Sequence, residues 1–522
     1  MLFNSIDYIF FFIFVVLVVA ALQRKKYQHL FLLVASYYFY WVSGSFLFLL
    51  MIFISLVTYY CGRGIADLTS TQKQKKTYLV IATVTSLGLL GFFKYFNFAV
   101  DSTNGLFAVL GIPYSIPLYG ILLPIGISFY TFHALSYIFD IYLRKIEPSK
   151  SLLEYTLYIA FFPQLVAGPI VRAREFLPQL KNKVVITPEN IKAGVTLMST
   201  GIVKKVIIAD NLAYYVNLVF SNPSVPIQDS TSFFIIAGTI LFGLQIFFDF
   251  SGYIDIALGS AKVLGFELPQ NFNGPYFSAS PTEFWRRWNI TLSSFIRDYL
   301  YIPLGGNRKG KVRTYINLMI SMVICGLWHG AAWNFLIWGA YHGVLLCTHK
   351  LIVDKNPLKY FKGTSLTSGQ PPTPADSDSS FGVRIQQKVL KITPSSILKI
   401  LITQYFIFLG WLIFRVHSLP DLLAAVQKYL FIDPQSVANG LIKYTDIIQT
   451  NLVLIGAFVV ITMILFNKKI RTDGIAALVN FDYVEYLQNL ELRSWGVYIM
   501  TVVLVLLCFS PSSSPEFIYF QF

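Results

Sequence analysis

Residues 232–258, SFFIIAGTILFGLQIFFDFSGYIDIAL, decide which kind of fold this chain can adopt. About 20 mainly apolar residues are enough for a helix to cross the hydrocarbon core of a bilayer, and this run is longer. The rest of the chain has the same character, because 55% of its 522 residues are hydrophobic, 17% are aromatic and only 13% are charged. Soluble globular proteins carry about 25% charged residues. The sequence therefore predicts an integral membrane protein.

Further apolar stretches of comparable length recur along the chain and predict an all-α, polytopic membrane protein. We expect about 10 to 12 of the stretches to be full transmembrane helices and one or two to be re-entrant. Residues 1–522 are expected to form a single integral-membrane domain. Besides 232–258, the stretches are 8–22, 29–43, 46–60, 78–99, 120–140, 152–170, 192–220, 314–328, 331–352, 397–416, 451–466 and 495–510.

The formal net charge of +15 is a second guide to the architecture. In a soluble protein it would suggest nucleic acid as a partner, whereas in a membrane protein Lys and Arg mark the cytoplasmic loops. If all basic loops face the cytoplasm, both termini lie outside and the number of crossings is even. All basic loops can lie on one side only if 152–170 does not cross fully. Pro163 and the pair Gly168-Pro169 fit a re-entrant segment there. The basic loops are 24–26, 73–76, 144–150, 308–313 and 468–471.

The N-terminus, the cysteines and one polar stretch complete the organisation of the chain. The N-terminus lacks a basic region and a small-residue cleavage site, so 8–22 is expected to be a first transmembrane helix rather than a removed signal peptide. The four cysteines have no ligand spacing, so we expect neither a metal site nor a disulfide framework. Residues 363–380, GTSLTSGQPPTPADSDSS, predict a disordered cytoplasmic linker.

The most informative polar residue in an apolar stretch is His329, within CGLWHGAAWN at 325–334. It follows Arg313 by 16 residues, about 24 Å along a helix, and is expected deep in the bilayer at the apex of a helical hairpin. A neutral imidazole there can act as a general base towards a hydroxyl group. The alternative is a histidine that is hydrogen-bonded for packing only. His342 would lie on a different face of a continuous helix.

A second group of polar residues lies in 283–308, EFWRRWNITLSSFIRDYLYIPLGGNR, where arginines are interleaved with aromatic residues. Arg286, Arg287, Arg297 and Arg308 are candidates to bind the phosphates of a nucleotide-bearing or phosphopantetheine donor at the cytoplasmic mouth. The alternative is a helix that anchors lipid headgroups at the membrane interface. Both interpretations place the segment at the cytoplasmic side of the membrane.

Two carboxylates interrupt the long apolar run, Asp249 and Asp255. Their spacing of six residues turns them to different sides of a helix, so they are not expected to form a catalytic pair. Hydrogen bonding within the fold is the favoured interpretation for both.

Six runs of residues together resemble the membrane-bound O-acyltransferase family, in its bacterial alginate O-acetyltransferase branch. The resemblance implies that His329 is the catalytic histidine and that the linker at 363–380 is an insertion. The family's second characteristic position, often His, is Asn289 here, so Asn289 is expected to orient groups rather than to transfer protons. The runs are FKYFNF at 93–98, LPIGISFYTF at 123–132, FFPQLVAGPIVRAREFLPQL at 161–180, FDFSGYIDIALG at 248–259, FWRRWNITLSSFIRDYLYIPLGGNR at 284–308 and GLWHGAAWNFLIWGAYHG at 326–343.

The chain ends in an aromatic tail, FIYFQF at 517–522. One interpretation is an aromatic anchor at the outer membrane interface. The tail also resembles an FxYxxF-type C-terminal motif that is found with this family. That resemblance implies that the Tyr519 hydroxyl is a candidate acyl acceptor, which would relay the acyl group outward.

The resemblance implies an O-acetyltransferase that moves acetyl from a cytoplasmic thioester donor across the membrane onto an extracellular, alginate-like polysaccharide. It implies acetyl-CoA as the donor substrate, no permanently bound cofactor, and a periplasmic or extracellular partner protein that passes the acyl group on. The expected location is the bacterial cytoplasmic (inner) membrane, in contact with lipid and without nucleic acid. Alternatives with the same fold are peptidoglycan O-acetylation and D-alanyl transfer to teichoic acid. An alternative of another class is a polysaccharide or lipid exporter without chemistry.

Overall fold

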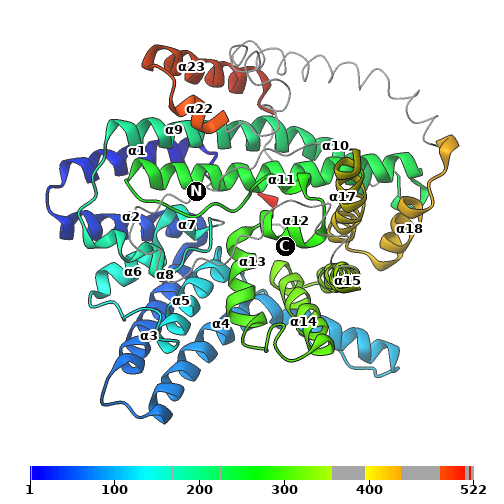
Figure 1. Cartoon of the computed structure of the whole chain (residues 1–522), viewed down its shortest axis with the longest axis horizontal. Coiled ribbons are helices and arrows are strands. Elements are labelled where there is room, and N and C mark those ends of the chain that lie inside the picture. Colours follow the sequence, from blue (N-terminus) through cyan, green and yellow to red (C-terminus); the bar gives the residue numbers. More distant parts are fainter. Residues whose placement is uncertain are drawn as a thin grey trace.

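The fold is built from helices, as the apolar stretches predict. A computed structural model describes residues 1, 3–166, 168–222, 225–355, 394–436, 483–511 and 517–518, and every regular element within these ranges is a helix. Six of the helices are long and apolar enough to cross a membrane. They are α3 Phe48–Ala66, α4 Gln72–Val109, α11 Ser232–Val263, α15 Trp333–Lys355, α17 Pro394–Arg415 and α23 Leu492–Phe509 (Figure 1).

The number of long apolar helices in the described ranges is smaller than the 10 to 12 crossings expected from the sequence. Helices α1 Ile6–Ala21 and α5 Ile127–Tyr142 have only 16 residues each. Helices α2 Lys25–Gly44 and α14 Lys311–His329 are longer, but they include more polar residues. The predicted stretch 451–466 and the predicted linker 363–380 lie outside the described residues.

The segment that was expected to be re-entrant does not form a spanning helix. Helix α6 covers only Leu152–Ala160 and is followed by short helical turns and non-helical backbone that is buried in protein. Side chains from other elements satisfy this backbone: Ile170 N donates to Thr291 Oγ1 (3.1 Å), and Val171 N donates to His133 Nε2 (3.2 Å). Irregular backbone at membrane depth needs such partners. The neighbouring short elements are α7 Phe162–Leu165, α8 Ala173–Phe176 and η2 Gln179–Lys181.

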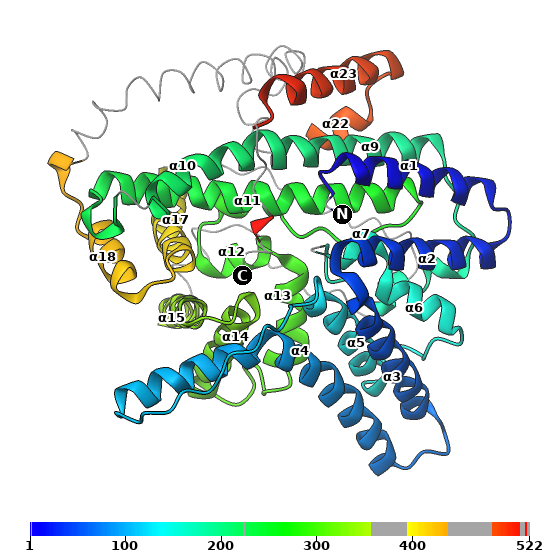
Figure 2. The ribbon, with the colours of Figure 1, turned by 180° about the vertical axis from the view of Figure 1, so that it is seen from behind.

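Two long helical segments lie side by side through the middle of the molecule (Figures 1 and 2). One is α11, and the other comprises α9 Pro188–Ile202, the π-helical segment η3 Val203–Ala209 and α10 Asp210–Phe220. Glycines allow their backbones to touch, because a Cβ atom at Gly201 would lie 2.5 Å from Gly252 O. Small residues at a helix interface are the usual means of close packing in membranes.

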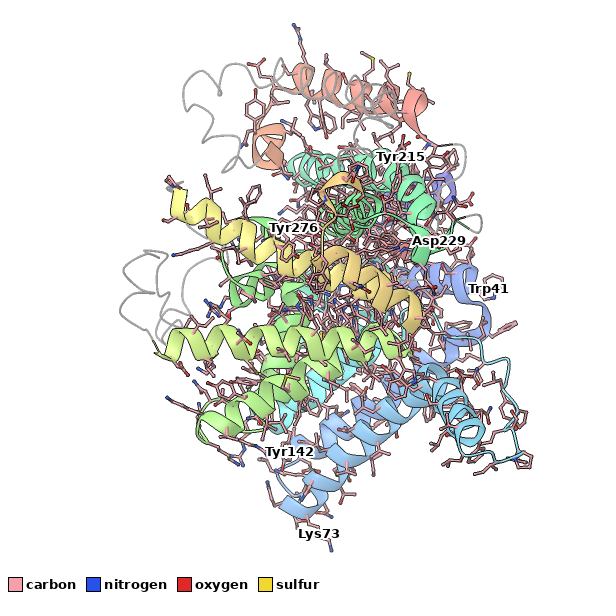
Figure 3. The ribbon with its side chains drawn as sticks, turned by 90° about the vertical axis from the view of Figure 1, so that its right-hand side faces the viewer. Trp41, Lys73, Tyr142, Tyr215, Asp229 and Tyr276 are labelled. Atoms are coloured by element: carbon pink, nitrogen blue, oxygen red, sulfur yellow. The ribbon has the colours of Figure 1, made fainter. Side chains whose placement is uncertain are left out.

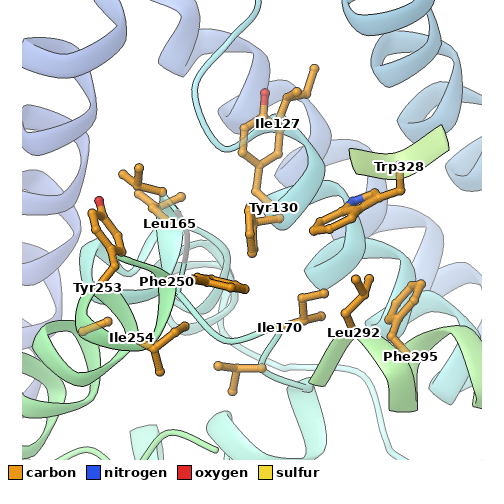
Figure 4. Packing of buried hydrophobic residues seen from close by; sticks show 14 of the residues in the cluster. Ile127, Tyr130, Leu165, Ile170, Phe250, Tyr253, Ile254, Leu292, Phe295 and Trp328 are labelled. Atoms are coloured by element: carbon orange, nitrogen blue, oxygen red, sulfur yellow. The ribbon is translucent and has the colours of Figure 1, made fainter. Parts of the chain in front are cut away.

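Buried aromatic and aliphatic side chains join α11 to the remaining helices. Figure 4 shows Tyr130 of α5, Phe250 and Tyr253 of α11, Phe295 of α13 and Trp328 of α14 converging on one interior. These helices therefore share a core, and the end of α14 lies in it. The remaining short elements are η1 Ser45–Leu47, η4 Ile227–Asp229, η5 Pro275–Phe277, α12 Pro281–Arg287, α13 Ile290–Ile296, η6 Arg297–Tyr301, α18 Leu419–Leu430 and α22 Tyr483–Gln488.

Figure 3 labels residues at or near the ends of several helices. Lys73, at the start of α4, and Tyr142, at the end of α5, lie together at the lower edge of Figure 3. Trp41, near the end of α2, and Asp229 lie on its right-hand side. That all basic loops share one side stays a prediction. Which side is cytoplasmic stays a prediction.

Candidate active site

The predicted hairpin around His329 is present. Helix α14 ends at His329, Gly330 to Ala332 form the turn, and α15 begins at Trp333. The two helices touch through their backbones, because a Cβ atom at Gly326 would overlap the carbonyl oxygen of Phe335. The glycines before and after His329 are therefore explained by packing of α14 against α15. His329 occupies the last residue of a helix whose end is buried in the core.

Aromatic rings surround the His329 imidazole on several sides. Its ring centroid lies 4.9 Å from that of Trp328, 5.0 Å from that of Trp338 and 5.4 Å from that of Phe414. His329 is only 5% exposed. A base in such a water-poor place can act on a bound hydroxyl group without competition from bulk water.

The second buried histidine, His342, approaches the same aromatic cluster. Its ring centroid lies 4.7 Å from that of Trp338 and 5.2 Å from that of Trp285. The sequence argument had separated it from His329 on the assumption of one continuous helix, and that assumption was wrong. The break after His329 folds α15 back, so that both histidines contact Trp338. Gly410 provides the space, because a Cβ atom there would lie 2.6 Å from His342 Nε2.

Lys94 and Tyr95 of α4 reach the end of α14, although the sequence argument gave them no role. Lys94 Nζ donates to the carbonyl oxygens of Trp328 and His329, the latter at 3.1 Å. The Tyr95 hydroxyl donates to Leu327 O at 2.9 Å. A lysine in the middle of the apolar stretch 78–99 was the signal that could have pointed to this contact.

Asn289 is buried at the junction of α12 and α13. It adopts a left-handed conformation, with φ 41° and ψ 58°, which Asn tolerates better than most residues. Two ring contacts connect its neighbour Trp288 to the histidine cluster: Trp288 to Trp411 at 4.7 Å and Trp411 to Trp338 at 6.3 Å. The backbone conformation suits Asn289, and its orienting role stays a prediction.

The four candidate phosphate-binding arginines are not equivalent. Arg286, Arg297 and Arg308 are exposed, and Arg297 Nε also binds Asp298 Oδ1 at 2.7 Å. Arg287 is partly buried and bound within the protein, to Glu283 Oε1 at 2.8 Å and to Asn273 O at 3.2 Å. Three of the four are thus exposed, one of them in an ion pair, and Arg287 has a structural task.

A buried ion pair connects the arginine-rich block to the re-entrant segment. Arg172 Nη2 lies 2.6 Å from Asp298 Oδ2, and the guanidinium sits 5.2 Å from the ring centroid of Tyr299. Burial alone would raise the pKa of Asp298. The hydrogen bond from Arg297 and the charge of Arg172 outweigh that effect and hold this pKa below its usual value. The sequence argument missed Arg172, which lies in the quoted run 161–180.

Asp249 and Asp255 have separate partners, as their spacing predicts. Asp255 pairs with Lys204 at 2.6 Å, whereas Asp249 Oδ1 pairs with Lys205 at 2.7 Å. Lys205 also binds Asp210 Oδ1 at 2.7 Å. Neither carboxylate of the α11 run contacts the other in this arrangement, and both serve the fold.

Two residues of the C-terminal tail are buried beside Asp249. Ile518 N donates to Asp249 Oδ2 at 2.7 Å, and Phe517 stacks on Tyr253 with ring centroids 4.4 Å apart. For Phe517 and Ile518 the interpretation as an anchor at the membrane interface is therefore wrong, because a buried carboxylate and an aromatic face hold them in the core. Tyr519 lies outside the described residues.

Comparison with known proteins gives a consistent picture. Residues 143–355, which contain the arginine-rich block and the α14–α15 hairpin, match the model of the membrane-bound O-acyltransferase family. The chain is 40% identical to a probable alginate O-acetylase of Pseudomonas putida, over 59% of this chain and 62% of that protein. It is 37% identical to a probable alginate O-acetylase of Pseudomonas aeruginosa, over 73% of this chain and 65% of that protein. The chain thus spans less than two thirds of the length of these two relatives.

A third relative is matched more completely. The chain is 33% identical to a peptidoglycan O-acetyltransferase of Helicobacter pylori, over 71% of this chain and 68% of that protein. Identity at this level over two thirds of a relative, together with the family model and the all-helical fold, establishes kinship. The chain belongs to the membrane-bound O-acyltransferase family.

Proposed function

We propose that this protein is an O-acetyltransferase that takes acetyl from a thioester donor on the cytoplasmic side and delivers it to an extracellular polysaccharide of the alginate type. The observation that carries the proposal is the position of His329. It ends a buried helix at the apex of a hairpin and is enclosed by Trp328, Trp338 and Phe414. The names of the relatives, alginate O-acetylase and peptidoglycan O-acetyltransferase, support acetyl as the group and a polysaccharide as the final acceptor.

The proposed reaction needs a base more than an energy source, because a thioester is already an activated acyl group. His329 takes the proton of an acceptor hydroxyl while the hydroxyl oxygen attacks the thioester carbonyl carbon. The new carbon–oxygen bond forms and the carbon–sulfur bond breaks. The leaving thiolate then takes the proton from the imidazolium, which returns His329 to its neutral state. Asn289 is proposed to orient the reacting groups.

On the donor side, acetyl-CoA is the proposed substrate, and no bound cofactor is required. The exposed guanidinium groups of Arg286, Arg297 and Arg308 are suited to its phosphates, because arginine binds phosphate through paired hydrogen bonds. Arg287 is a weaker candidate, since Glu283 and the Asn273 carbonyl already occupy its guanidinium.

On the acceptor side, Tyr519 is proposed to receive the acetyl group first. Support comes from the buried position of its neighbours Phe517 and Ile518, which ties the tail to the core of the fold. A periplasmic or extracellular partner would carry the group from there to the polymer. The proposed location is the inner membrane with both termini outside. If the variant Tyr519→Phe acetylates polymer normally in cells, the relay through Tyr519 is wrong.

The function is tested by following labelled acetyl. Inside-out membrane vesicles are prepared from alginate-producing bacteria that lack their own acetylase and express the full-length chain. External [14C]acetyl-CoA should yield label that is covalently bound to alginate and is released by mild base. An exporter without chemistry gives no covalent label, and that result would overturn the proposal.

Peptidoglycan is the second candidate acceptor, because the peptidoglycan O-acetyltransferase relative is matched over the largest share of its own length among the three relatives described. The same vesicles distinguish the two polymers. Label in muropeptides after muramidase digestion indicates peptidoglycan, whereas label in alginate-lyase products indicates alginate. If neither polymer carries label and D-alanine is found on teichoic acid, the function would instead be D-alanyl transfer to teichoic acid.

A further inference from the structure

We propose that Lys94, assisted by Tyr95, is a positioning residue for the reaction: it fixes the end of α14 and thereby the place of the His329 imidazole. This inference rests on the proposed role of His329 as the base. Neither residue belongs to the hairpin itself. Both come from α4, more than two hundred residues earlier in the chain. Helix α4 crosses α14 near the C-terminal end of α14 (Figure 2).

The first argument concerns the carbonyl groups at the end of a helix. The last four carbonyls of any α-helix have no amide partner within the helix. Unsatisfied carbonyls are costly in an apolar interior, where water cannot replace the missing donors. Lys94 binds the carbonyls of Trp328 and His329, and the Tyr95 hydroxyl binds that of Leu327. Two neighbouring side chains of α4 therefore satisfy three successive carbonyls of the last turn, including that of His329.

The second argument concerns how α4 meets the rest of the protein. Most of the apolar part of α4 faces outward, since only 17% of its residues there are buried inside the protein. Its polar contacts to α14 are concentrated at Lys94 and Tyr95, and Phe98 adds a ring contact to Trp333 at 5.6 Å. The turn between α14 and α15 is thus held from one side by a short stretch of α4.

The third argument concerns charge. Lys94 forms no ion pair with a carboxylate among the described residues. Its Nζ lies 5.9 Å from the ring centroid of Trp328, which also contacts His329. Its hydrogen bonds go to the carbonyls of Trp328 and His329, so a change of Lys94 is expected to act through the position of the His329 ring.

The experiment uses the full-length chain in the vesicle assay described above, with acetyl-CoA titrated so that the maximal rate and the KM for the donor are obtained separately. Lys94→Met removes the ammonium group at nearly equal length, Lys94→Gln retains one amide donor, and Lys94→Arg retains charge and donors. The matched control is Lys428→Met. Lys428 also binds three carbonyls, those of Ile227, Gln228 and Ser230, but lies elsewhere in the fold.

Misplacement of a catalytic group by about 1 Å can cost about 100-fold in rate. We expect Lys94→Met to lower the maximal rate by about 10- to 100-fold, with the KM changed by less than about twofold. Lys94→Arg should restore part of the rate, Lys94→Gln should lie between, and Lys428→Met should keep the wild-type rate. Thermal unfolding in detergent identifies any variant that fails to fold. If Lys94→Met fails to fold, Lys94→Gln is compared with Lys428→Met instead.

The inference is overturned if Lys94→Met keeps the wild-type rate, if Lys428→Met loses as much, or if the loss is confined to KM. After any of these results the proposed function is still supported, as long as the wild-type chain transfers label and His329→Gln does not. If the wild-type chain transfers no label, the proposed function fails and this inference fails with it.

Discussion

Two lysines on different helices illustrate two uses of a cation inside this protein. Lys205 of η3 is 3% exposed and lies between the carboxylates of Asp210 and Asp249, each at 2.7 Å. Lys94 of α4 is partly buried and binds only backbone carbonyls at the end of α14. The first lysine is paired with two carboxylates, whereas the second binds carbonyl groups next to His329.

The difference separates a structural site from a candidate reaction site. The Lys205 cluster is a closed network that also holds Ile518, so it ties α10, α11 and the C-terminal tail together. At the end of α14, Lys94 and Tyr95 bind backbone carbonyls, beside the ring that is proposed to act as the base. Loss of Lys205 should therefore affect stability, whereas loss of Lys94 should affect rate.

The largest expected effect on stability is that of Lys205→Met. Removal of one partner from a buried ion network leaves an uncompensated charge and typically costs about 3–5 kcal/mol. Thermal unfolding of the detergent-purified chain measures it. The control is Lys262→Met, because Lys262 pairs with an exposed Glu267 at 3.0 Å and should contribute at most about 1 kcal/mol. Equal effects of the two substitutions would remove the contrast between a closed network and a surface pair.

A smaller loss of stability is expected for Gly326→Ala. The added methyl group overlaps Phe335 O in α15, and overpacking of this kind costs about 1–3 kcal/mol. Because the strain falls on the hairpin, transfer activity should fall with stability. Gly88→Ala in α4 is the matched control, since a Cβ atom there meets nothing within 4 Å. A Gly326→Ala variant as stable and as active as Gly88→Ala would contradict the close packing of α14 and α15.

The smallest expected effect concerns the arginines. Arg286→Gln should raise the KM for acetyl-CoA by roughly fivefold, because an exposed ionic contact contributes about 1 kcal/mol at most. Arg287→Gln should leave the KM nearly unchanged and lower the unfolding temperature, since Arg287 is bound to Glu283 and Asn273. The titration of donor in vesicles distinguishes the two. The opposite pattern would mean that Arg287, not Arg286, meets the donor.

Much of the fold and the central residue of the site could be predicted from the sequence. Hydropathy alone indicates α11, and the glycines around His329 indicate a tight hairpin with the histidine at its apex. The number of long helices could not be predicted well, because hydropathy does not reveal where a helix ends within an apolar stretch, as at α1 and α5, which have 16 residues each. The break within 152–170 was expected. Here proline and glycine gave the only local signal.

The partners of the buried charges could not be predicted, because they are distant in the chain. Lys94 meets His329 across 235 positions, and Ile518 meets Asp249 across 269. Local patterns carry no information on such pairs. An anchor at the membrane interface was therefore one of two interpretations of the tail, although Asp249 offers Ile518 a partner in the core. The position of His342 beside Trp338 was missed for a related reason, since it depends on the helix break after His329.

The most direct test of the central claim compares two buried histidines in one assay. His329 and His342 are 5% and 1% exposed, and both contact Trp338. His329→Gln and His342→Gln are each measured for single-turnover transfer of [14C]acetyl from acetyl-CoA in the vesicles, after normalisation to folded protein. We expect His329→Gln to lose at least about 100-fold, the usual contribution of a general base, and His342→Gln to lose less than about tenfold. Equal losses, or transfer at the wild-type rate by His329→Gln, would contradict the assignment of His329 as the base.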